Sequence, residues 1–144
     1  MKRRSVLALM AAALALPAVA APGGPVMKVY KDAGCGCCSE WVTHLQRAGF
    51  TVSAENADMS VVRKKFSVPA ELGSCHTAVV DGYLIEGHVP AREVRRLLAE
   101  RPKARGLAVP GMPAGSPGME GPRSDRYAVL LFDTAGRTSV YQRY

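Results

Sequence analysis

Hydrophobic and polar positions repeat along most of the chain with one of two periods. Alternating or short continuous apolar runs, as in strands, occupy residues 27–31, 50–54, 75–80 and 83–88. Apolar residues recur at helical spacing over 39–48, in a short stretch after Asp58, and over 91–101. The pattern predicts helices that alternate with short strands.

Glycine and proline mark the ends of these segments. Gly49 ends the first predicted helix, Pro69 ends the second, and Pro102 follows the third. Asp81-Gly82 is the strongest hairpin signal in the chain, so the two strands beside it are expected to pair antiparallel. The order β-α-β-α-β-β-α, with a Cys pair at the start of the first helix, predicts a single thioredoxin-like α/β domain.

The chain beyond the third helix has a different character. Residues 106–122 are rich in glycine and proline, a composition that we expect to exclude regular helix and any central strand. Met112 and Met119 lie among otherwise small residues in this segment, which favours a shaped loop over a plain linker. Residues 127–132 and 138–141 alternate again and predict a C-terminal β-hairpin.

The N-terminus has the pattern of an export signal. A basic start is followed by an apolar run up to Leu16 and by an Ala-Val-Ala cleavage site. The run is shorter than the roughly 20 residues that span a bilayer, and Pro17 ends it, so a membrane anchor is not expected. We interpret residues 1–20 as a cleaved signal peptide and residues 21–144 as one periplasmic domain that is not membrane-bound after cleavage.

Charge and motifs narrow the function classes. The chain has 19 Lys and Arg against 12 Asp and Glu, but three of the basic residues lie in the signal peptide and the rest are scattered. Scattered positive charge is typical of a solvated surface, so no nucleic-acid partner is expected. Because no phosphate-binding loop, carboxylate pair or nucleophile elbow stands out, a hydrolase is not supported. Asp81, Glu86 and His44 are interpreted as turn or surface residues.

Four cysteines carry the candidate chemistry. Cys35, Cys37 and Cys38 fall within four residues, and Cys75 follows later. An even number of cysteines in an exported protein first suggests structural disulfides. A bridge between the adjacent Cys37 and Cys38 would close almost no loop, however, and would constrain the unfolded chain little. Thiols at the start of a helix become thiolates more easily, and thiolates both bind metals and attack disulfides. The cluster therefore predicts reactive or metal-binding thiols without deciding between them.

Further sulfur and imidazole donors accompany the cluster. Cys75-His76 opens a strand that the predicted fold places beside the cysteine turn, and His88 ends the next strand. Cu(I) prefers thiolate and thioether ligands, and imidazole also suits copper. Met112 and Met119 have two possible roles, metal ligation through their thioethers and packing over the site, and the sequence does not decide between them. The alternative for Cys75 is a small buried hydrophobe, and the alternative for His88 is an exposed turn residue.

Five segments share a distinctive pattern with one known family. They are Cys35-Gly36-Cys37-Cys38 with Trp41, Ser74-Cys75-His76-Thr77-Ala78, Glu86-Gly87-His88-Val89-Pro90, Gly106-Leu107-Ala108-Val109-Pro110-Gly111-Met112-Pro113 and Gly115-Ser116-Pro117-Gly118-Met119-Glu120. With this combination, spread over most of residues 27–141, the chain resembles the CopG-type periplasmic copper-resistance proteins, a former domain-of-unknown-function family.

The resemblance implies a thioredoxin-like fold, export, and a copper site in which cysteine sulfurs bridge several Cu(I) ions. It also raises an oxidoreductase role on copper, which it leaves open. The expected metal ligands are the thiolates of Cys35, Cys37, Cys38 and Cys75, completed by His88, by Met112 or Met119, and by His76 as a ligand or as a residue that orients one. The expected partners are copper ions and other periplasmic copper-handling or redox proteins.

Two hypotheses follow from the sequence. The leading one is a periplasmic protein of copper resistance or homeostasis that binds Cu(I) through the cysteine cluster with histidine and methionine support. The alternative is a thiol–disulfide oxidoreductase that uses the C-x-x-C pair Cys35 and Cys38. This alternative leaves Cys37, Cys75 and the loop methionines without a role. Silver and zinc are further metals that thiolates accept.

Overall fold

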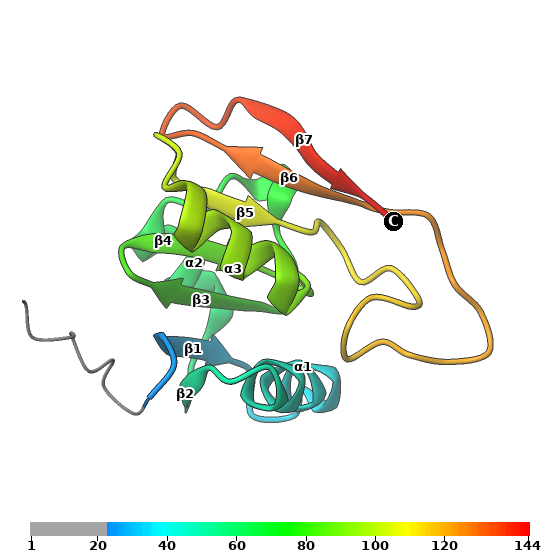
Figure 1. Ribbon diagram of the computed structural model, residues 1–144. Coiled ribbons are helices and arrows are strands. Elements are labelled where there is room, and N and C mark those ends of the chain that lie inside the picture. The colour runs from blue at the N-terminus through cyan, green and yellow to red at the C-terminus, as the bar shows by residue number, and fades with distance from the viewer. Residues whose placement is uncertain (1–22) are drawn as a thin grey trace, which may run out of the picture.

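The computed structural model describes residues 23–144, in which one mixed β-sheet carries helices on both faces (Figure 1). In chain order the elements are β1 (Val26–Lys31), α1 (Gly36–Arg47), β2 (Thr51–Asn56), α2 (Met59–Phe66), the 3₁₀ helix η1 (Ala70–Leu72), β3 (His76–Val80), β4 (Tyr83–Glu86), α3 (Ala91–Glu100), β5 (Gly106–Ala108), β6 (Ala128–Phe132) and β7 (Thr138–Arg143). The predicted α/β class is confirmed, and its thioredoxin-like arrangement stays a prediction.

The predicted signal peptide, residues 1–20, lies outside the described residues. Within the described part of the chain, no helix combines the length and the apolar character that crossing a bilayer requires.

The sheet has the strand order β2-β1-β3-β4-β5-β6-β7. β1 pairs parallel with β2, β4 pairs parallel with β5, and the other neighbours are antiparallel. The predicted hairpin of β3 and β4 is confirmed. Asp81 and Gly82 form its turn with φ values of 47° and 84°, the positive values that a tight two-residue hairpin turn requires. The predicted C-terminal hairpin is also present, as β6 and β7.

One strand contradicts the sequence analysis. Gly106–Ala108 forms β5 in the middle of the sheet, between β4 and β6, although this segment was expected to exclude a central strand. Gly106 pairs with Leu84, and a β-carbon at residue 106 would lie 1.8 Å from the Leu84 carbonyl oxygen. The strand therefore forms because glycine lets the two backbones approach, and it ends before Pro110, which has no N–H for a ladder.

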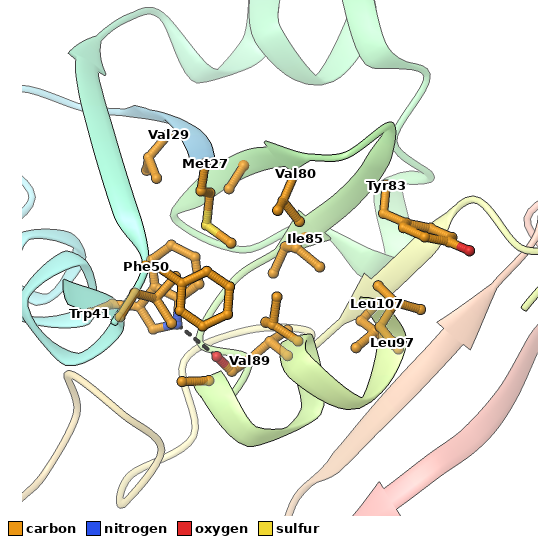
Figure 2. Close-up of a cluster of buried hydrophobic side chains, with 14 of the residues drawn as sticks. Met27, Val29, Trp41, Phe50, Val80, Tyr83, Ile85, Val89, Leu97 and Leu107 are labelled. Carbon is orange, nitrogen blue, oxygen red and sulfur yellow. Dashed lines mark hydrogen bonds between the residues drawn. The ribbon is translucent and has the colours of Figure 1, made fainter. Parts of the chain in front are cut away.

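Most of the hydrophobic core lies between one face of the sheet and the helices α1 and α3. Trp41 of α1 and Leu97 of α3 are fully buried there. The strand residues beneath them include Met27, Val29, Ala78, Val80, Ile85 and Leu107. Figure 2 shows this cluster, in which the Trp41 indole N–H donates to the carbonyl of Val89 at 2.8 Å. This bond ties α1 to the chain between β4 and α3.

The opposite face is covered by α2 and η1. Its smaller core consists of Leu72, Leu84, Ala108 and Phe132, with Phe66 and Val68 packed against it. Asp58 caps α2 as predicted, because its carboxylate accepts the backbone N–H groups of Ser60 and Val61. Helices thus cover both faces of the sheet. The cysteines and the histidines His76 and His88 gather at one end of it, beside the first turn of α1.

Candidate metal centre

The first turn of α1 contains two of the cysteines. α1 begins at Gly36, three residues before the predicted start, and Cys35 is its N-cap. Cys35 Sγ accepts the backbone N–H of Cys38 at 3.3 Å. Cys37 and Cys38 therefore lie in the first turn of α1, at the positive end of the helix dipole.

The four cysteine sulfurs converge, as the sequence predicted. All four lie within 4.8 Å of one another. Cys35 and Cys38 form a disulfide, whereas Cys37 and Cys75 are free thiols. Cys37 Sγ lies 3.5 Å from Cys35 Sγ and 3.9 Å from Cys75 Sγ, so the free thiols stand directly beside the disulfide. The bridged residues are the C-x-x-C pair that the alternative hypothesis from the sequence used, whereas the leading hypothesis used all four cysteines as thiolates.

Cys75 is held in place through its neighbour Ser74. The Ser74 N–H donates to Glu86 Oε1 at 2.8 Å, and the Ser74 carbonyl accepts Nη1 of Arg63 at 2.8 Å. The Ser74 hydroxyl donates to the carbonyl of Gly111. Three segments thus anchor the backbone just before Cys75, which brings the Cys75 thiol to the cysteine turn.

Glu86 corrects the sequence interpretation, which placed it in a turn or on the surface. Its side chain is fully buried, and its second carboxylate oxygen accepts the Thr77 hydroxyl at 2.5 Å. Burial raises the pKa of Glu86, while the hydrogen bonds from Thr77 and Ser74 act in the opposite direction. A charged residue inside the apolar run of β4 was the available signal, because such a residue needs buried partners.

Two histidines complete a second group of donors around Cys75. His76 and His88 are both fully buried, so the exposed-turn alternative for His88 is wrong. His88 Nε2 lies 3.0 Å from Cys75 Sγ, and His76 Nδ1 lies 3.4 Å from the same sulfur. The donor atoms of Cys75, His76 and His88 lie within 4.8 Å of one another. Cys75 therefore belongs to both a sulfur group and an imidazole group.

The tautomer of His88 follows from its other ring nitrogen. His88 Nδ1 lies 2.7 Å from the carbonyl oxygen of Pro117, which can only accept a hydrogen bond. Nδ1 therefore carries the proton, and the lone pair of Nε2 points to Cys75 Sγ. A carbonyl that orients the far nitrogen is the usual support of a metal-binding histidine. The role of Pro117 could not be predicted from the sequence, because a backbone carbonyl leaves no side-chain signal.

His76 is less completely satisfied. Its ring packs against the Trp41 ring at a tilt of 35°, with 4.3 Å between ring centroids, and its Nε2 is buried without a hydrogen-bond partner among the described residues. Burial, with a smaller contribution from His88, lowers the pKa of His76 to about 3. The nitrogen that faces Cys75 Sγ is Nδ1, so a neutral His76 can offer Nδ1 to a metal while Nε2 stays without a partner.

Burial also favours the neutral forms of Cys75 and His88. Burial, followed by the neighbouring Cys37 thiol, raises the pKa of Cys75 to about 12. Burial lowers the pKa of His88, against opposing effects of the Pro117 carbonyl and Glu120. At neutral pH the Cys75 thiol therefore donates its proton to a neutral His88, and a metal that binds Cys75 must displace that proton.

The methionine loop folds over the first turn of α1. Figure 1 shows residues 109–127, in yellow and orange, leaving the sheet and passing beside α1. A β-carbon on Gly118 would lie 2.6 Å from the Cys37 carbonyl oxygen and 2.8 Å from the Trp41 nitrogen. The hydrogen bonds from Gly115 N–H to the Met119 carbonyl and from Met119 N–H to the Ser116 carbonyl, both 2.8 Å, give the loop a defined shape.

The two predicted methionine ligands differ in position. Met119 is half-buried and follows Gly118, the residue that contacts α1, whereas the side chain of Met112 is 53% exposed. Met112 follows Gly111, whose carbonyl accepts the hydroxyl of Ser74, the residue before Cys75. Loop contacts thus place Met119 closer to the first turn of α1, and the ligand roles of both methionines stay predictions.

His44 is not the surface residue that the helical pattern indicated. It is half-buried, and its Nε2 accepts the backbone N–H of Ala91, the first residue of α3, at 3.0 Å. Burial lowers the pKa of His44, which keeps this nitrogen free to accept. Pro90, the N-cap of α3, provides no side-chain acceptor, and this uncapped helix start was the signal for a partner elsewhere.

Comparison with known proteins agrees with this arrangement. Residues 72–119, which include Cys75, both site histidines, Met112 and Met119, match the family model described as protein of unknown function, DUF411. No curated protein matches the chain.

Two solved structures are similar to the chain over most of its length. One, described as copper resistance protein CopG form 1, is 49% identical, with a TM-score of 0.78, and the match covers 83% of this chain and 96% of that one. The other, described as form 2 of the same protein, is 48% identical, with a TM-score of 0.79, and the match covers 84% and 98%. At this identity and coverage, the chain belongs to the CopG family of copper resistance proteins.

Proposed function

We propose that this protein binds Cu(I) through Cys35, Cys37, Cys38 and Cys75 and serves copper resistance or homeostasis. The convergence of four sulfurs within 4.8 Å, from α1 and from the start of β3, carries this proposal. Thiolates are the ligands that Cu(I) prefers, and sulfurs at this spacing suit bridging between several Cu(I) ions. Since two of the thiols form a disulfide, reduction must come before copper binding by all four.

Other donors and the relatives support copper in particular. His88 is oriented by Pro117, His76 lies beside Cys75, and the loop that bears Met112 and Met119 folds over α1. Methionine thioethers bind copper better than zinc. Structural zinc sites instead use four tetrahedral ligands, usually cysteine and histidine. The similar solved structures are both described as copper resistance proteins. Export to the periplasm, through the signal peptide predicted at residues 1–20, is part of the proposal.

A second function is supported by one specific observation. The Cys35–Cys38 disulfide closes a C-x-x-C motif at the start of α1, where thiol–disulfide oxidoreductases carry theirs. In that reaction the more exposed Cys35 is the attacking thiolate, and Cys38, which is fully buried, is the resolving thiol. This function assigns no role to Cys37 or Cys75.

Replacing Cys37 with serine separates the two functions. The fully reduced protein is loaded with Cu(I) without oxygen, and copper per chain is measured after desalting against a competing Cu(I) chelator. We expect Cys37→Ser to lower the number of coppers retained, because Cys37 lies between the sulfurs of Cys35 and Cys75. Glu40→Gln, a change of an exposed side chain in the same helix, is the control and should retain wild-type copper.

The same variants are then assayed for disulfide exchange with a dithiol substrate. An exchange enzyme would keep its rate in Cys37→Ser, since both residues of the C-x-x-C motif remain. Unchanged copper retention together with rapid exchange would sink the copper proposal and favour the second function.

Gly118→Ala tests whether the loop matters for copper. Residue 118 has φ of 86°, and an added β-carbon would meet the backbone of Cys37 and Trp41, so the loop must move away from α1. Because Pro117 orients His88, we expect Cu(I) affinity to fall by about 10- to 100-fold. Gly121→Ala meets nothing within 4 Å and is the matched control. Wild-type affinity in Gly118→Ala, measured by chelator competition, would rule out a role for the loop.

A further inference from the structure

Four cations that are far apart in the sequence lie together on the surface. Lys65 is in the last turn of α2, Lys103 and Arg105 precede β5, and Arg137 belongs to the turn between β6 and β7. They line three adjoining hollows of about 350, 270 and 250 Å³, which all share Asp133. We call these hollows with their lining cations the basic groove. The fold therefore gathers positive charge that the sequence scatters.

The basic groove keeps an excess of positive charge. The one carboxylate among its lining residues is Asp133, which accepts two backbone N–H groups of its own turn and Nε of Arg137 at 2.8 Å. This carboxylate is therefore committed to the turn. Within the described part of the chain, no carboxylate forms a salt bridge with Lys65, Lys103 or Arg105.

Arg105 is held in place at the wall of the groove. Its backbone N–H donates to the carbonyl of Phe132 at 2.7 Å, and its own carbonyl accepts the N–H of Leu84 at 3.0 Å. The half-buried guanidinium donates from Nη2 to the carbonyl of Phe66 at 3.4 Å. A guanidinium has further N–H donors in a fixed fork that matches the two oxygens of a carboxylate. Arg105 can therefore bind an acidic group without first being ordered.

The shape of the basic groove favours one kind of anionic partner. Its hollows are open to solvent and adjoin one another between three segments of the chain, which suits an extended chain better than a single enclosed ion. A flat bilayer surface does not fit a concave wall. None of the large exposed hydrophobic side chains of the described residues lines the groove, so it has no apolar group to insert into lipid. Aspartate and glutamate side chains on an extended segment fit both the ammonium and the guanidinium donors.

The basic groove lies away from the cysteine cluster. Arg105 comes just before β5, whereas the hydroxyl of Ser74, the residue before Cys75, reaches the carbonyl of Gly111, shortly after β5. The groove and the cysteine cluster are therefore at opposite ends of this strand (Figure 1). A segment bound in the groove need not touch the cysteines, so docking and copper binding can be measured separately.

We propose that the basic groove docks an acidic segment, rich in aspartate and glutamate, of another protein. The carboxylates of that segment bind Lys65, Lys103 and Arg105, the cations that have no carboxylate partner within the described residues. Complementary charge of this kind speeds association and selects the partner. The inference goes beyond the proposed function and does not depend on copper binding.

Fluorescence anisotropy of a labelled octaglutamate peptide, titrated with the metal-free protein, tests the inference. We expect saturable binding that weakens as salt is raised from about 10 to about 200 mM, because salt screens charges at a surface. Lys65→Glu with Lys103→Glu should raise Kd at least about tenfold, since both side chains line the groove. Lys65→Gln with Lys103→Gln removes the charges without reversing them and should cause a smaller loss.

A matched control makes the same change in net charge on the other face of the sheet. Arg47→Glu with Arg95→Glu alters exposed residues of α1 and α3, and it should leave Kd within about twofold of the wild type. Circular dichroism checks that each variant is folded. Equal losses in the two charge-reversed variants, or no peptide binding at low salt, would overturn the inference. Binding of phosphatidylglycerol vesicles that the groove variant loses, without peptide binding, would overturn it in favour of a membrane surface.

Discussion

Replacing Cys75 with serine is expected to abolish copper retention, the largest effect of any single substitution in the site. Cys75 belongs to both donor groups, and its sulfur lies 3.9 Å from Cys37 Sγ and 3.0 Å from His88 Nε2. A serine hydroxyl is a hard, neutral oxygen that Cu(I) binds poorly. We expect Cu(I) affinity of the reduced protein to fall by more than about 100-fold, beyond the loss typical of residues that only orient a ligand.

Cys35→Ser is the matched comparison for Cys75→Ser. It removes one sulfur and the disulfide but leaves the group of Cys75, His76 and His88 intact, so its loss of Cu(I) affinity should be smaller. Both affinities are measured by competition with a Cu(I) chelator, and circular dichroism checks that each metal-free variant is folded. Equal losses in the two variants would contradict the central position assigned to Cys75.

Replacing Trp41 with alanine should cause a large loss of stability. Trp41 is fully buried, donates to the carbonyl of Val89 at 2.8 Å, and packs against the His76 ring. Removing a buried aromatic ring costs about 3–5 kcal/mol of unfolding free energy, from lost burial and from the cavity. We expect urea denaturation of the metal-free protein to show a decrease of this size.

Two further variants calibrate the Trp41 result. Trp41→Phe keeps most of the ring but leaves the Val89 carbonyl without its donor, for an expected loss of about 1–3 kcal/mol. Val61→Ala changes a side chain that is 62% exposed, and surface changes of this kind stay within about 0.5 kcal/mol. A Trp41→Ala protein as stable as Val61→Ala would contradict the role of Trp41 as the link between α1 and the site.

Local signals were sufficient to predict most of the fold. The apolar faces of the helices, the capping residue Asp58 and the Asp81-Gly82 turn all act within a few residues, so periodicity and turn chemistry reveal them. The start of α1 was placed three residues late because its first turn is occupied by cysteines rather than by periodic apolar residues. The convergence of the four cysteines was predicted from the same β-α order.

Features that depend on distant partners could not be predicted in this way. β5 forms because Gly106 meets Leu84 closely, and a glycine-rich sequence carries no sign of its neighbour. Glu86 is buried because Ser74 and Thr77 donate to it, and both lie on another segment. Such contacts depend on which residues of neighbouring strands are paired, and the periodicity of one segment does not determine that pairing.

X-ray absorption at the copper edge of the reduced, Cu(I)-loaded protein tests the central claim most directly. Sulfur atoms should dominate the nearest neighbours of copper, because the cysteine sulfurs converge within 4.8 Å. Cys75→Ser should remove this sulfur signal together with the copper. A copper site surrounded mainly by nitrogen and oxygen, unchanged in Cys75→Ser, would contradict the assignment of the cysteine cluster as the copper site.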